Sequence, residues 1–163
     1  ILPEVMTMVM ELIKWLSVAD RYTKMQLDRR FSPFGLNSSQ HMYIITICQN
    51  PGMTQEQFYH MFYLNPSNIT RSLNTLIKTG FITKEPNSQD RRTYVLYPTP
   101  KARHVYNALI QTIRETETFL LDGIPEEDRS AFVKILKQTA LRAVSANEKE
   151  TNSDQKKGIS PDE

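Results

Sequence analysis

The segment from Asn65 to Gly80 constrains the fold of this chain more than any other, because the sequence marks both ends of a helix there. An Asn side chain accepts hydrogen bonds from the free amides of a first helical turn, and Pro66 suits the first helical position. A glycine suits the left-handed position that follows a helix. Between these ends, apolar residues recur at helical spacing at Ile69, Leu73, Leu76 and Ile77. The pattern predicts an amphipathic helix over residues 66–79.

The polar face of this predicted helix carries amides, hydroxyls and cations, and no carboxylate. Its members are Ser67, Asn68, Thr70, Arg71, Asn74 and Lys78. A face without Asp or Glu does not repel phosphate, and Asn and Arg side chains can each make paired hydrogen bonds to base edges in a major groove of DNA. For a helix standing alone, an ordinary solvated face is the better interpretation. The neighbouring segments decide between the two.

A second short helix precedes the first. Thr54 and Gln57 form the sequence pattern of a capping box, which predicts a helix over residues 54–61. A helix, a short turn and a capped helix make a helix-turn-helix arrangement, whose second helix enters the major groove. This context favours DNA binding over the solvated-face interpretation.

The segment after the capped helix predicts a β-hairpin, or wing, over residues 81–97. Runs at 81–85 and 93–97 mix β-branched and aromatic residues at strand length, and turn-forming residues separate them. The tip of the hairpin carries Asp90, Arg91 and Arg92. The arginines make the wing a second candidate contact with DNA.

Charge is distributed unevenly along the chain. The net charge of +2 is too small to indicate a nucleic-acid partner. Residues 65–105, however, contain seven basic and two acidic residues, a net charge of +5, whereas residues 1–64 are balanced. Positive charge is therefore concentrated on the segment that is expected to face phosphate.

Together these motifs resemble the MarR family of winged helix-turn-helix transcription regulators. The resemblance covers residues 2–144, and its most specific parts are Ile69-Thr70-Arg71, Leu73, Leu76, Gly80-Phe81-Ile82 and Asp90-Arg91-Arg92. It implies that the helix over 66–79 binds in the major groove and that Arg92 reaches the adjacent minor groove, where negative potential is concentrated. It also implies that Asp90 braces the wing by pairing with basic neighbours.

One motif departs from the family. Where the family usually has Leu-Thr followed shortly by Gly, this chain has Pro98-Thr99-Pro100-Lys101-Ala102. Thr99 as a cap and Pro100 at the first helical position still predict a helix start. We interpret the departure as local.

The flanking segments complete the predicted architecture. Apolar spacing predicts a long first helix ending near Phe31, a helix over 40–49 capped by Ser38 or Ser39, and later helices over 100–122 and 125–144. The predicted fold class is mainly α with a small β-hairpin: a winged helix-turn-helix domain flanked by N- and C-terminal dimerisation helices. The expected divisions are a single domain at 1–145, with dimerisation helices at 1–35 and 100–145 and a DNA-binding core at 38–97, and a polar tail at 146–163.

A homodimer follows from the long terminal helices, whose apolar stripes a small winged domain cannot cover. Two-fold symmetry would set two DNA-binding helices about one DNA turn apart, roughly 34 Å, so the expected partner is double-stranded DNA with an inverted-repeat operator. The resemblance further implies a repressor that a small aromatic or lipophilic effector relieves. Trp15, Tyr22, Met25 and Tyr43 are candidates to line an effector crevice, but core packing is the favoured interpretation for each, and no effector residue is assigned.

Other sites are weakly supported. Cys48 is the only cysteine, which excludes an internal disulfide and suggests a cytoplasmic protein; a buried inert thiol is favoured over a redox sensor. His41, His60 and His104 lack metal-ligand spacing, so neither a metal nor a cofactor is expected. The apolar N-terminal stretch is too short to span a bilayer and contains two glutamates, so no membrane partner is expected.

Two other classes of function remain as alternatives. An enzyme is disfavoured, because the chain has no Gly-rich phosphate loop, nucleophile elbow or convincing pair of nucleophile and base. A winged helix that serves only as a protein-interaction module is disfavoured by Arg71, Arg91 and Arg92, which packing does not require. A regulator that responds to oxidants through Cys48 is a further alternative.

Overall fold

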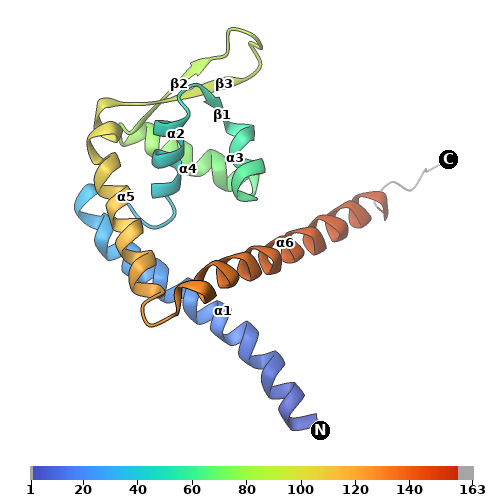
Figure 1. The fold of residues 1–163 in the computed structure, drawn as a ribbon. Helices are drawn as coiled ribbons and strands as arrows, with labels where there is room; N and C mark the ends of the chain where they lie inside the picture. The colour runs from blue at the N-terminus through green and yellow to red at the C-terminus, as the bar shows by residue number, and fades with distance from the viewer. Residues whose placement is uncertain (1, 158–163) are drawn as a thin grey trace, which may run out of the picture. The chain divides into compact units, whose positions relative to one another are not determined.

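The computed structural model describes the backbone of residues 2–157 and the side chains of residues 11–148. The elements, in chain order (Figure 1), are α1 (Leu2–Phe31), a 3-10 turn (Ser32–Phe34), α2 (His41–Gln49), β1 (Met53–Thr54), α3 (Gln55–Phe62), α4 (Pro66–Lys78), β2 (Ile82–Pro86), β3 (Tyr94–Pro98), α5 (Pro100–Leu120) and α6 (Glu126–Lys157). The predicted fold class, mainly α with a small hairpin, is confirmed. The chain forms two compact units, residues 1–117 and residues 118–163. None of the described helices is long and apolar enough to cross a membrane.

The sheet is antiparallel with strand order β1-β3-β2. The predicted hairpin is confirmed: β2 pairs with β3 from Ile82 opposite Pro98 to Pro86 opposite Tyr94. Strand β1 was not predicted, and it pairs Met53 with Leu96 across the sheet. A two-residue strand has no periodic pattern that a sequence could show. The strand nevertheless ties the start of α3 to the wing.

The core of the first unit is built from one side of each helix and from the inner face of the sheet. Its fully or nearly buried members include Phe31, Tyr43, Ile44, Ile47, Phe58, Ile69, Leu73, Leu76, Phe81, Ile82, Leu96 and Leu109. Three of the four residues of the predicted α4 stripe are buried, and Ile77 is half-buried. This burial fixes which face of α4 is left to solvent.

Core packing is confirmed for Tyr43 and is wrong for the other three candidate crevice residues. The side chains of Trp15, Tyr22 and Met25 lie on α1 and are exposed in the single chain. Periodicity indicates that a residue belongs to an apolar stripe, but it does not say whether the same chain covers that stripe.

The predicted cap of α2 is wrong. The N-cap residue is Gln40, and its side chain makes no capping hydrogen bond. Ser39 does not cap because Asn37 Oδ1 accepts both its backbone N–H, at 3.0 Å, and its hydroxyl, at 2.6 Å. The backbone N–H of Ser38 donates instead to Asp28 Oδ1 at 2.7 Å, which lowers the pKa of that carboxyl. The bonds to Asn37 form an Asx turn, and α2 begins only after it, at His41.

Helix α6 extends beyond its predicted end near Val144. The polar segment expected as a tail from residue 146 is helical as far as Lys157, and residues 158–163 lie outside the described part of the chain. No glycine or proline occurs between Pro125 and Gly158, and Glu, Lys and Ala are good helix formers. Polarity alone is therefore no signal for the end of a helix.

Candidate nucleic-acid interface

Helix α4 has the ends that the sequence predicts. Asn65 Oδ1 accepts the backbone N–H of Ser67 at 2.9 Å, and Pro66 stands at the first helical position. At the other end Gly80 is left-handed, with φ of 81°. The N–H of Phe81 donates to the carbonyl of Leu76 at 2.9 Å, which closes the last turn and buries the Phe81 ring in the core.

The polar face of α4 is exposed throughout. Every residue proposed from the sequence lies on it: Ser67, Asn68, Thr70, Arg71, Asn74 and Lys78. Because α4 contains no Asp or Glu, this face offers amides, hydroxyls and cations only. Such a surface is chemically suited to base edges and phosphates.

Helix α3 begins with the predicted capping box, in which the backbone N–H of Thr54 donates to Gln57 Oε1 at 2.8 Å. Gln55, which the sequence analysis did not select, reaches across to α4. Its Nε2 donates to Thr70 Oγ1 at 2.6 Å, and the Thr70 hydroxyl in turn donates to the carbonyl of Pro66 at 3.0 Å. This contact joins residues fifteen positions apart, so only the packing of α3 against α4 reveals it.

The turn between α3 and α4 contains an unusual backbone conformation. Tyr63 has φ of 55° and ψ of 35°, and it is the one non-glycine residue with positive φ in the described chain. Its backbone N–H donates to the carbonyl of Tyr59 at 2.8 Å, and its side chain is exposed. The left-handed residue allows the chain to leave α3 and enter α4 within a short turn.

At the tip of the wing, Asp90 organises the backbone. Its Oδ1 accepts the backbone N–H of Arg92 at 3.0 Å and lies 3.5 Å from Arg92 Nε, and its carbonyl accepts the N–H of Thr93 at 2.9 Å. The side chain of Arg92 is 93% exposed. Arg91 is also exposed. Both arginines are therefore presented to solvent by a tip that is held locally.

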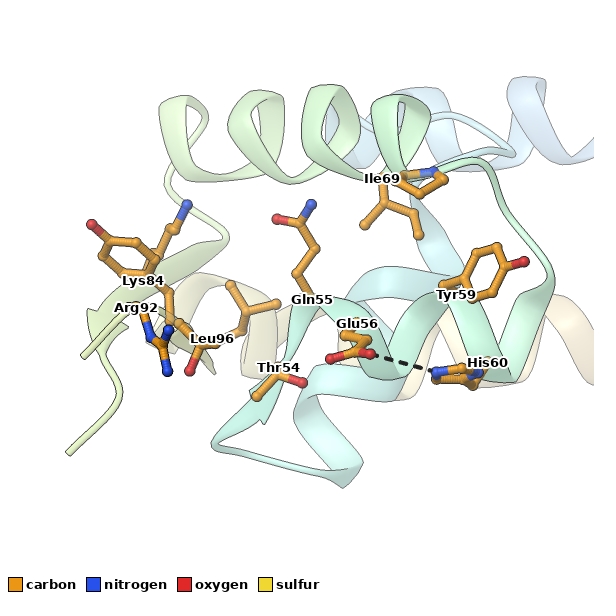
Figure 2. Close-up of a pocket in the computed structure, with 12 residues that line it drawn as sticks. Thr54, Gln55, Glu56, Tyr59, His60, Ile69, Lys84, Arg92 and Leu96 are labelled. Atoms are coloured by element: carbon orange, nitrogen blue, oxygen red, sulfur yellow. Dashed lines mark ion pairs between the residues drawn. The ribbon is translucent and has the colours of Figure 1, made fainter. Parts of the chain in front are cut away.

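A groove of about 510 Å³ lies between α3, α4 and the wing (Figure 2). Lys84 of β2 enters this groove with Nζ 4.3 Å from the centre of the Tyr94 ring. The sequence analysis counted Lys84 only as part of the net charge. Its position beside the ring depends on the register of the hairpin, in which Lys84 stands opposite Leu96.

The end of α4 is joined to the start of α5. Thr99 Oγ1 lies 2.7 Å from the carbonyl oxygen of Gly80 and 3.1 Å from that of Phe81. Lys101 Nζ donates to the carbonyl of Thr79 at 2.8 Å and lies 4.3 Å from the centre of the Phe81 ring. The segment that departs from the family motif thus supplies hydrogen-bond donors to the carbonyls of the residues that follow α4.

Cys48 is half-buried on α2, near Gln49, Arg103 and Tyr106. Burial raises the pKa of the Cys48 thiol, and the charge of Arg103 offsets part of that rise. A raised pKa lowers the fraction of reactive thiolate. Among the residues that the structure describes, no group of three or more His, Cys, Asp and Glu side chains is placed to hold a metal ion.

Two short helices joined by a turn and followed by a hairpin wing define the class of winged helix-turn-helix proteins. Residues 36–94 of the chain match the model of the MarR family. Together with the fold, this match makes residues 36–94 similar to the MarR family of winged helix-turn-helix transcription regulators.

Individual relatives are consistent with this similarity. YybA, an uncharacterised HTH-type transcriptional regulator of Bacillus subtilis, is 28% identical over 106 residues, which cover 65% of this chain and 71% of YybA. A MarR family regulator of Listeria monocytogenes, solved with a 26mer DNA, aligns with a TM-score of 0.76 and 22% identity over 82% of this chain and 89% of its own. A mutant of MarR from E. coli, solved with operator DNA, aligns with a TM-score of 0.73 and 16% identity. The alignment covers 80% of this chain and 94% of the E. coli chain. At these identities the two structures show a common fold.

Proposed function

We propose that this protein is a homodimeric regulator that binds double-stranded operator DNA with α4 in the major groove and the wing over the adjacent minor groove. One observation carries the proposal: the polar face of α4 is exposed and free of carboxylates, and it is followed by a wing whose Arg92 is almost fully exposed. The Listeria and E. coli relatives were solved with DNA, which supports the same partner here.

The contacts divide by chemistry. Arg71 and the two asparagines of the polar face are suited to base edges, whereas Ser67 and Lys78 are suited to phosphates. Arg92 is assigned to the minor groove, and Arg91 beside it is assigned to the DNA backbone. Asp90 is the residue that braces the wing. In this proposal the DNA-binding core is residues 38–97.

The dimer is supported by apolar side chains that the single chain leaves exposed. On α1 they are Leu12, Ile13, Trp15, Leu16, Tyr22 and Met25, and on α6 they are Phe132, Val133, Ile135, Leu136 and Leu141. Exposed apolar side chains that gather on one helix mark interaction sites. A second copy of the chain covers it in our proposal, and two-fold symmetry then favours an inverted-repeat operator.

The regulator acts without catalysis, in the cytoplasm, and represses transcription until a small aromatic or lipophilic effector shifts the dimer to a spacing that misses successive grooves. The family resemblance supports this response. Regulation by oxidation of Cys48 is the less favoured alternative, because burial raises the pKa of its thiol.

A titration of the protein with DNA from its own upstream region tests the proposal. The dissociation constant should rise by orders of magnitude between ~50 and ~200 mM salt, because phosphate contacts release counterions. Arg71→Ala should cost about 1–3 kcal/mol of binding free energy on the upstream sequence that the wild type prefers, and less on scrambled DNA. Arg21→Ala, an exposed arginine of α1, is the control and should bind as the wild type does. A wild-type protein with no preference for any upstream sequence would contradict the proposal.

A further inference from the structure

The groove between α3, α4 and the wing is lined by both apolar and polar or charged side chains. The almost fully buried Ile69 and Leu96 give it an apolar floor, and Gln55, Lys84 and Arg92 line it from α3, β2 and the tip of the wing (Figure 2). It borders the polar face of α4 directly, because Gln55 is hydrogen-bonded to Thr70 of that face. A ligand in this groove would therefore be continuous with anything bound along α4.

The lysine that lines this groove packs against an aromatic ring. Lys84 Nζ lies over Tyr94, and no ion pair of Lys84 with a carboxylate occurs among the described residues. Its neighbour Glu85 points to the opposite face of the strand, since successive side chains alternate. The ammonium thus keeps its hydrogen-bond donors available to an anion.

The groove contains one carboxylate, which faces a histidine of the same groove. Glu56 Oε1 lies 3.8 Å from His60 Nε2 on the same helix (Figure 2). With Lys84 and Arg92 on the other side, the lining has more cations than carboxylates. The groove therefore has the charge that suits an anion and the floor that suits an apolar group next to it.

Alternating anionic and apolar groups are the chemistry of the sugar-phosphate backbone. We propose, on the basis of the proposed function, that this groove seats one phosphate of the DNA strand that runs between α4 and the wing. Lys84 donates to the phosphate oxygens, and Gln55 donates the amide hydrogen that Thr70 does not use. The adjoining deoxyribose packs on the floor formed by Ile69 and Leu96. The seat fixes the register of the protein on DNA without reading sequence.

The substitution Lys84→Met tests this seat, because it removes the charge and keeps an unbranched stem against Tyr94. Binding should weaken roughly three- to tenfold, equally on the operator and on scrambled DNA, and the slope of log affinity against log salt should fall by about one. Lys84→Arg should restore the slope. Lys24→Ala on α1 removes one charge in the same unit and should leave slope and affinity unchanged.

Gln55→Ala provides the second measurement. It should weaken binding to all sequences without changing the salt slope, because an amide releases no counterion. Thermal unfolding of each variant, followed by circular dichroism, separates loss of the seat from loss of the fold.

Failure of the seat differs from failure of the proposed function. If the wild type binds its operator and Lys84→Met binds with the same affinity and salt slope, the proposed phosphate site is refuted. The proposed function as a DNA-binding regulator is then unaffected. A loss confined to one base sequence would also refute the phosphate site, since the residue would then read a base. A wild type that does not bind DNA overturns the proposed function first.

Discussion

At the scale of the residue, Tyr63 holds a backbone conformation that costs free energy in any residue with a Cβ. Glycine adopts the same conformation without that cost. Tyr63→Gly should therefore raise the free energy of unfolding by about 1 kcal/mol relative to Tyr63→Ala, which loses the ring and keeps the strain. Urea denaturation of the two variants measures the difference. Equal stabilities would mean that the turn relaxes and stores no strain.

The sequence predicted which α4 residues would be exposed, because a helical period assigns a face to each residue once the apolar stripe is known. It could not select Gln55 or Lys84. Gln55 gains its place from a hydrogen bond to another helix, and Lys84 gains its place from a ring on another strand. Contacts between elements leave no local pattern in the sequence. These two residues could therefore be identified only from the folded structure.

At the scale of the element, the junction of α4 with α5 depends on one hydroxyl. Thr99→Val keeps the shape of the side chain and removes the group that pairs with the carbonyls of Gly80 and Phe81 and caps the N–H of Ala102. We expect a loss of about 1–3 kcal/mol in the free energy of unfolding. Thr83→Val, on the exposed side of β2, is the control and should change stability little. A loss no larger than that of the control would show that the hydroxyl does not hold the junction.

Element boundaries were predictable where a cap has a sequence signature. Asn65, Gly80 and the Thr54–Gln57 box all behave as their residue types predict. The start of α2 was not predictable, because Asn37 competes for the N–H and hydroxyl of Ser39. Which of several neighbouring polar residues caps a helix depends on small differences between local hydrogen bonds.

At the scale of the whole molecule, the exposed apolar surface of α1 predicts self-association. Ile13 is 66% exposed in the single chain, so Ile13→Glu should leave the fold of the chain intact and weaken the dimer. Light scattering should give twice 18.9 kDa for the wild type and a lower mass for the variant at the same concentration. Ser88→Glu, at the exposed tip of the wing, adds the same charge and should remain dimeric. A wild type with the mass of one chain would contradict the dimer.

The bonds from Thr99 and Lys101 to the end of α4 have a mechanical consequence. They tie the end of α4, the helix that we propose binds DNA, to the start of α5, so we expect a change in the direction of one helix to be passed to the other. If α4 lies in the major groove as proposed, its tilt in that groove should follow the direction of α5.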